Sequence, residues 1–139
     1  MYGKCRIGGR LPEYELPETS LKTKIHSLAK ALAIDAIEDA DIDLMGQSNA
    51  DKWRTGCIMA NIYGVQEIRH ETAGKLRLLK QMPHVVCSLI CLDYGIRGHI
   101  SAASGASVAG AVAIGDAYRL IRDGYMDRIL VGGLDYNCN

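Results

Sequence analysis

The sequence contains no phenylalanine and a single tryptophan, so leucine, isoleucine, valine and tyrosine must fill any core. It also lacks an excess of charge of either sign, because 16 acidic residues balance 16 basic ones. Charge therefore indicates neither a nucleic-acid partner nor a membrane surface. No apolar run approaches the roughly 20 residues of a membrane span. At 139 residues the chain forms one domain at most, large enough to bury a core.

Two further absences concern targeting and phosphate binding. The N-terminus has no apolar signal core, and Glu13, Glu15 and Glu18 come too early for an acid-poor transit peptide. Neither G-x-G-x-x-G nor a lysine-bearing Walker pattern occurs, so the common phosphate-binding loops can be set aside. We expect a cytoplasmic protein, with the mitochondrion as the alternative.

The cysteines are odd in number: Cys5, Cys57, Cys87, Cys91 and Cys138. An odd count, with three members in apolar segments, is typical of reduced thiols in an intracellular protein. Cys87 and Cys91 lie four residues apart on one face of a predicted helix, as a pair of metal ligands would. Because two further converging ligands are not evident, we interpret them as small apolar core residues and expect no metal site.

Apolar spacing predicts the first elements. The periodicity of Leu21, Ile25, Leu28 and Leu32 predicts a helix from there to about Ala40, and the polar residues 41–53 are loop-like. Residues 55–60 (TGCIMA) form a short apolar run typical of a buried strand, and a helix is expected to follow through residue 68.

Proline and glycine mark the boundaries of the next helix. Pro83 fits the first turn of a helix over 84–93, which Gly95 can end in a left-handed conformation.

The last third of the sequence predicts a strand, a helix and a second strand. Residues 100–103 are strand-like, residues 105–107 form a turn of small residues, and residues 128–132 are a buried strand. The helix between them runs from Val108 to Arg122, and its apolar face comprises Val112, Ala113, Leu120 and Ile121. Strand–helix–strand at this length is a βαβ unit, which predicts the α/β class with a parallel sheet.

The turn before this helix is the place where chemistry is most expected. Ser107 occupies its apex, where the N–H groups of the first helical turn and the helix dipole favour negative charge. The alternative is a tightly packed corner without reactivity. Residues 105–109 nearly match the G-x-S-x-G elbow of serine hydrolases, but that fold places its histidine after the serine. All four histidines precede Ser107, which argues against a self-contained hydrolase.

Several motifs around this turn resemble those of the β-ketoacyl-acyl-carrier-protein synthases, which have the thiolase fold. Residues 94–98 (YGIRG) resemble the family's Y-G-[LI]-R-G, and residues 106–107 (AS) fall where the family has Ala-Cys. Residues 114–117 (IGDA) resemble I-G-x-A, and residues 127–133 (DRILVGG) resemble a following D-[VI]-[MI]-[VL]-[AV]-G-G. Weaker similarity is collinear upstream, from residue 25.

The resemblance implies a homodimer without a cofactor that condenses an acyl group with malonyl on acyl carrier protein, through an acyl thioester on cysteine. It gives Ser107 the nucleophile position, with its own N–H as one of two oxyanion donors, and places Ile62 at the border of the acyl pocket. Basic residues that would receive the carrier protein are Lys22, Lys24, Arg77 and Lys80; for each, the alternative is a solvated side chain on a helix face.

The sequence also departs from the family. Serine replaces the nucleophilic cysteine, and the two catalytic histidines and the lysine belong to a C-terminal half that these residues do not include. A central N-terminal strand and a strand after Gly133 are missing as well. We therefore interpret residues 1–139 as a single partial domain, an incomplete N-terminal half with about three strands in a parallel or mixed sheet.

Three functional hypotheses follow. The first is a β-ketoacyl synthase-like protein of fatty acid or polyketide synthesis that is inactive alone. The second is a non-catalytic subunit that dimerises with an active synthase. The third is a serine acyl hydrolase or transferase.

Overall fold

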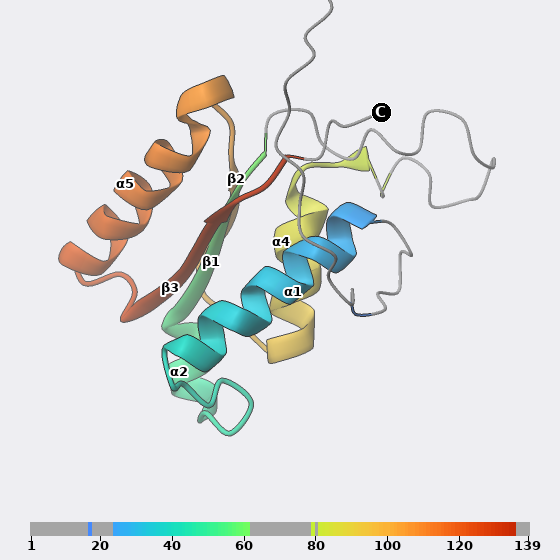
Figure 1. Ribbon diagram of the computed structural model, residues 1–139. Coiled ribbons are helices and arrows are strands. Elements are labelled where there is room, and N and C mark those ends of the chain that lie inside the picture. Colours follow the sequence, from blue (N-terminus) through green and yellow to red (C-terminus); the bar gives the residue numbers. More distant parts are fainter. Residues whose placement is uncertain (1–16, 18–23, 62–78, 80, 136–139) are drawn as a thin grey trace, which may run out of the picture.

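The computed structural model describes residues 17, 24–61, 79 and 81–135 (Figure 1). The elements follow in the order α1 (Lys24–Asp39), α2 (Asn49–Trp53), β1 (Thr55–Ala60), α4 (His84–Tyr94), β2 (Ile100–Ala103), a short 3-10 helix (Ala106–Val108), α5 (Ala109–Arg122) and β3 (Arg128–Gly133). None of the helices in this described part is long and apolar enough to cross a membrane.

The three strands form one parallel sheet in the order β2-β1-β3. In the central strand, Cys57 lies opposite Ile100 of β2 and opposite Leu130 of β3. Helices α1 and α4 cover one face of the sheet and α5 covers the other (Figure 1). The predicted α/β class with a small parallel sheet is therefore confirmed.

Strand β1 is buried on both faces, as its continuous apolar run predicts. Alternate side chains point to opposite faces of a strand. Cys57 and Met59 accordingly join the core beneath α1 and α4, whereas Ile58 and Ala60 join the core beneath α5. Two separate apolar cores thus share a single strand.

Helix α4 begins where predicted and ends one residue later than predicted. It starts directly after Pro83 and ends at Tyr94, and the φ of 67° at the following Gly95 is left-handed, as expected. Residues that carry a Cβ atom rarely adopt this backbone conformation, so glycine suits the position. The N–H groups of Gly95 and Ile96 both bond to the carbonyl of Cys91 and thereby close the last turn.

The buried faces of α1 and α5 differ from the predicted ones. In α1, Ile25 and Leu28 are buried, but Leu32 is exposed. In α5, the buried residues are Ala109, Ala113 and Ala117, with Leu120 partly buried at the same core; Val112 and Ile121, predicted to face inward, are exposed. Alanines at i, i+4 and i+8 form one stripe, which lets the helix axis approach the sheet closely.

Helix α2 was not predicted from the polar stretch 41–53. Its N-cap is Ser48, whose hydroxyl accepts a hydrogen bond from the N–H of Asp51 at 3.2 Å. This capping bond is local, and the helix buries none of its residues. The helix expected from residue 61 to residue 68 lies outside the described residues.

An ion pair joins the starts of β1 and β3. Arg54 donates from Nε and from one terminal nitrogen to the two carboxylate oxygens of Asp127, and the N–H of Asp127 bonds to the carbonyl of Arg54 at 2.9 Å. The hydrogen bonds from Arg54 hold the pKa of Asp127 below its usual value. Asp127, the first residue of the DRILVGG motif, therefore makes a structural contact at the end of the sheet opposite the β2–α5 turn.

The alanine stripe of α5 can be tested by overpacking. Ala113 is fully buried, so Ala113→Leu should lower the free energy of unfolding by about 1–3 kcal/mol, because the added volume forces the helix from the sheet. The matched control is Ala111→Leu, on the exposed side of the same helix, which should change it by no more than about 0.5 kcal/mol. Urea unfolding measures both. Equal effects would contradict the observed packing.

Candidate active site

Ser107 lies at the turn between β2 and α5, as predicted. Strand β2 ends at Ala103, a single 3-10 turn covers residues 106–108, and α5 continues to Arg122. The serine side chain is exposed to solvent. The parallel sheet places this turn at the carboxyl edge of the strands, where α/β proteins commonly bind ligands.

Backbone strain is concentrated immediately before the serine. Ala106 has a φ of 48°, in the left-handed region, which costs an L-residue about 1–2 kcal/mol. Such strained residues cluster at functional sites, where the surrounding structure holds them in place. The strained backbone of Ala106 therefore supports this turn as a functional site more strongly than its small residues alone do.

The N–H of Ser107 is available as a donor in this turn. The N–H of Val108 bonds to the carbonyl of Gly105 at 3.1 Å, and the N–H of Ala109 bonds to the carbonyl of Ala106. Within residues 24–61 and 81–135, the N–H of Ser107 has no acceptor. This is the donor expected for an oxyanion, and it lies at the positive end of the 14-residue helix α5.

A general base for Ser107 is missing from the described part of the chain. No histidine or carboxylate there forms a hydrogen bond with its hydroxyl. His99 lies directly before β2, at the end of the strand opposite the Ser107 turn, and its Nε2 contacts the Ser101 hydroxyl at 3.1 Å. His99 thus has a hydrogen-bond partner on the strand that it precedes, and the serine hydrolase hypothesis gains no support.

Of the remaining predicted site residues, only Lys24 lies in the described part of the chain. Lys24 is the first residue of α1 and is exposed. Ile62, Lys22, Arg77 and Lys80 lie outside the described residues, so their assigned roles remain predictions.

An apolar hollow of about 310 Å³ lies elsewhere, between the end of α1 and β3. Thr55 and Arg128 in its lining are the first residues of their strands, so the hollow opens away from the edge that carries Ser107. It is not a pocket for a group attached to this serine.

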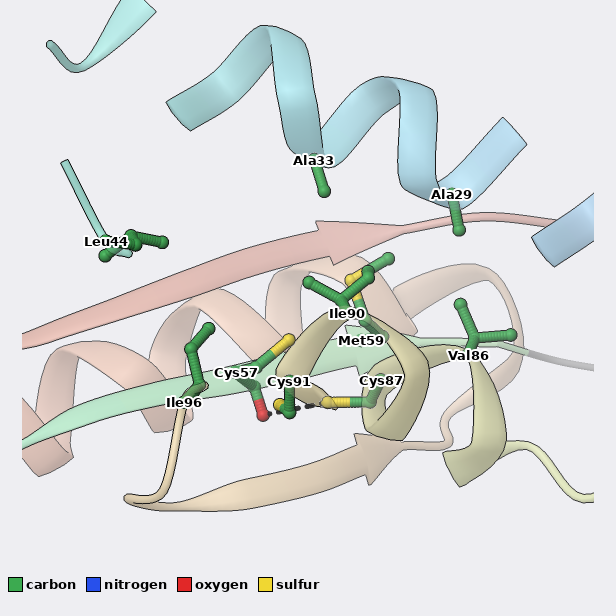
Figure 2. Close-up of a cluster of buried hydrophobic side chains, with 10 residues drawn as sticks. All are labelled: Ala29, Ala33, Leu44, Cys57, Met59, Val86, Cys87, Ile90, Cys91 and Ile96. Carbon is green, nitrogen blue, oxygen red and sulfur yellow. Dashed lines mark hydrogen bonds between the residues drawn. The ribbon is translucent and has the colours of Figure 1, made fainter. Parts of the chain in front are cut away.

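Sequence reasoning missed one cluster of reactive side chains. Cys87 and Cys91 are buried core residues, as predicted, but Cys57 of β1 joins them (Figure 2). The three sulfur atoms lie within 4.8 Å of one another. The i, i+4 spacing revealed two of these residues, whereas the third is 30 residues upstream and only the packing of α4 on β1 brings it near.

Comparison with known proteins identifies the family. Residues 14–139 match the family described as beta-ketoacyl synthase, N-terminal domain. The crystal structure of a beta-ketoacyl synthase from Burkholderia phymatum STM815 is similar in fold, with a TM-score of 0.68 and 22% sequence identity over 84% of this chain. The match covers 32% of that synthase, so the chain spans about a third of its length. No curated protein sequence matches. The chain, with its thiolase-like α/β fold, belongs to the β-ketoacyl synthase family.

Proposed function

We propose that this chain contributes the nucleophile corner of a β-ketoacyl synthase-like protein of fatty acid or polyketide synthesis, and that the 139 residues alone do not condense acyl and malonyl thioesters. The observation that carries the proposal is the position of Ser107 after the strained Ala106, at the start of α5. Acyl carrier protein would deliver both thioesters, and Lys24, exposed at the start of α1, is the described residue that suits its acidic surface.

The geometry supplies two of the requirements of acyl transfer. It holds a side-chain oxygen outward at the corner, and it offers the Ser107 N–H and the helix dipole to a developing negative charge. A cysteine here could ionise with this help, because its free pKa is about 8.5. A serine hydroxyl is a much weaker acid and needs a neighbouring base. The sequence contains no histidine or lysine after Ser107 to provide one.

The second candidate is a non-catalytic subunit that dimerises with an active synthase and shapes its acyl pocket. The observation that favours it is the combination of a serine at the nucleophile position and the missing base in the described residues. The two candidates differ in whether the corner still activates a nucleophile placed there.

Replacing the serine with cysteine tests that activation. In Ser107→Cys, the N-terminus of α5 should lower the thiol pKa, and an interaction of about 0.3–1 kcal/mol gives about two- to fivefold more thiolate at pH 7. The matched control is Ser104→Cys, which introduces an exposed thiol into the same connection but before the turn. Iodoacetamide alkylation, followed for each cysteine by peptide mass spectrometry, should be faster at position 107 by this factor.

Equal alkylation rates at positions 104 and 107 across the pH range would show that the corner does not stabilise a thiolate. That result would contradict the first candidate, in which the corner activates a nucleophile, and would favour the non-catalytic subunit.

Condensing activity itself should be absent. The chain incubated with acyl- and malonyl-loaded acyl carrier protein should form no β-ketoacyl product, because these residues do not include the two histidines and the lysine that the family resemblance implies for malonyl decarboxylation. Ser107→Cys should remain inactive for the same reason, although it restores the thiol. Product above that of a heat-denatured sample, measured by mass spectrometry of the carrier protein, would refute the proposal.

The outer strand gives the chain a means of self-association, and we propose that it forms homodimers. The N–H groups of Cys57 and Asn61 bond to the carbonyls of His99 and Ala103, so the alternate residues Ile100 and Ala102 direct their backbone groups away from β1. Within the described residues this edge carries no partner strand. An uncharged edge of this kind can pair with a second copy.

A charge on this edge should weaken the association. We expect the chain to sediment as a dimer or larger species at high micromolar concentration, and Ile100→Lys to shift it toward monomer. Ile114→Lys is the control, because it changes an exposed isoleucine on the outer side of α5. A monomeric parent chain would contradict the proposal. If Ile100→Lys and Ile114→Lys shift the chain toward monomer equally, the interface does not lie at the edge of β2.

A further inference from the structure

Three cysteine thiols from two packed elements meet in the core beneath α1. Cys57 is the third residue of β1, and Cys87 and Cys91 lie one turn apart on the face of α4 that packs against it (Figure 2). Their exposed fractions are 0%, 0% and 3%. A strand and a helix, rather than a loop, therefore fix the relative positions of the sulfur atoms.

The spacing of the sulfurs suits a shared metal ion. All three lie within 4.8 Å of one another. With a metal–sulfur bond of about 2.3 Å, a planar three-coordinate ion needs sulfurs roughly 4.0 Å apart. Small rotations of the side chains could meet this requirement. A disulfide, by contrast, needs about 2.05 Å between two sulfurs and would leave the third thiol unused.

The surroundings select the kind of ion. The neighbouring side chains in this core are alanine, leucine, valine, isoleucine and methionine, which offer no carboxylate or imidazole. Hard ions such as Mg²⁺ and Ca²⁺ require oxygen ligands. Structural Zn²⁺ prefers four ligands, whereas this part of the structure provides three thiols in a dry core. Thiolates in a core whose other potential donor is the soft thioether of Met59 favour a soft ion that accepts low coordination.

Local hydrogen bonds stabilise an anionic sulfur at one position. Bonds from the thiols of Cys57 and Cys91 lower the pKa of Cys87, and the backbone N–H groups of Ser101 and Met59 act in the same direction, whereas burial raises it; the pKa values of Cys57 and Cys91 are raised. When protonated, the Cys87 thiol donates to the carbonyl of Cys57 at 3.1 Å (Figure 2). The sulfur that most readily becomes a ligand is thus already positioned at β1.

We propose that Cys57, Cys87 and Cys91 form a buried three-coordinate site for a thiophilic metal ion of the Cu(I) class. Each thiol that becomes a ligand releases its proton to solvent, so the affinity should fall as the pH is lowered. The ion would link β1 to α4 and stabilise the folded chain. This site shares no residue with the Ser107 corner, and its existence does not depend on the proposed acyl chemistry.

The test uses the full chain carrying Cys5→Ser and Cys138→Ser, which leaves only the three clustered cysteines. Anaerobic titration with Cu(I), buffered by a weak chelator, should end at one ion per chain, with an ultraviolet sulfur-to-copper charge-transfer band and a rise in Tm. Adding Cys57→Ala or Cys91→Ala should abolish both the end point and the band. Ile90→Val is the matched control, because it removes volume from the same core but keeps the thiols.

Three results would overturn the proposal. The first is no Cu(I) binding by the folded parent chain. The second is an end point that survives removal of either cysteine. The third is tighter binding of Zn²⁺ than of Cu(I) in the same titration, which would refute the ion class. X-ray absorption at the copper edge needs no substitution in the cluster, so it remains decisive if the alanine variants do not fold. Three sulfur ligands are expected, and fewer would refute the site.

Discussion

The burial of β1 on both faces is the constraint on which the other elements depend. Its backbone groups pair with β2 on one side and β3 on the other, and its side chains divide between two apolar cores. Close backbone contacts fix its first residues: a Cβ atom on Gly98 would lie 2.5 Å from the carbonyl oxygen of Thr55, so only glycine fits there. Because α4 and α5 both take their positions from this strand, the thiol cluster and the Ser107 corner are two consequences of one packing arrangement.

The parts of the fold that could be predicted from sequence are those with local causes. The run of buried residues in β1, the proline before α4 and the left-handed Gly95 after it are signals that act within a few residues. The exposed side chains of Leu32, Val112 and Ile121 show where this reasoning ends. Periodicity identifies a helix, but the neighbouring element decides which of two adjacent stripes is buried, and in α5 it is the stripe of alanines.

The distinction between local causes and packing between elements also applies to the Ser107 corner and the cysteine cluster. A strand, small residues and a helix in succession predict the corner, because the chain itself connects its parts. The strained φ of Ala106 could not be predicted from composition, since alanine gives no sign of a left-handed residue. The cysteine cluster needs α4 to lie across β1, which no spacing within either segment reveals. Cys57 was therefore missed although Cys87 and Cys91 were recognised as a pair.

The Ser107 corner separates two contributions to acyl transfer that are usually found together. Position and anion stabilisation come from the backbone: the turn after β2, the unused N–H and the start of α5 are present whichever side chain occupies position 107. Nucleophilicity comes from the side chain and its base, because the oxygen of serine must lose a proton before it attacks a thioester. Strain at Ala106 costs stability whether or not a base is near. A corner that keeps this strained geometry without a proton acceptor can still bind negative charge, such as the oxygen of a polarised thioester carbonyl. Within the described residues, the corner therefore offers stabilisation of negative charge but no proton acceptor for Ser107, which is the physical basis of the proposed inactivity.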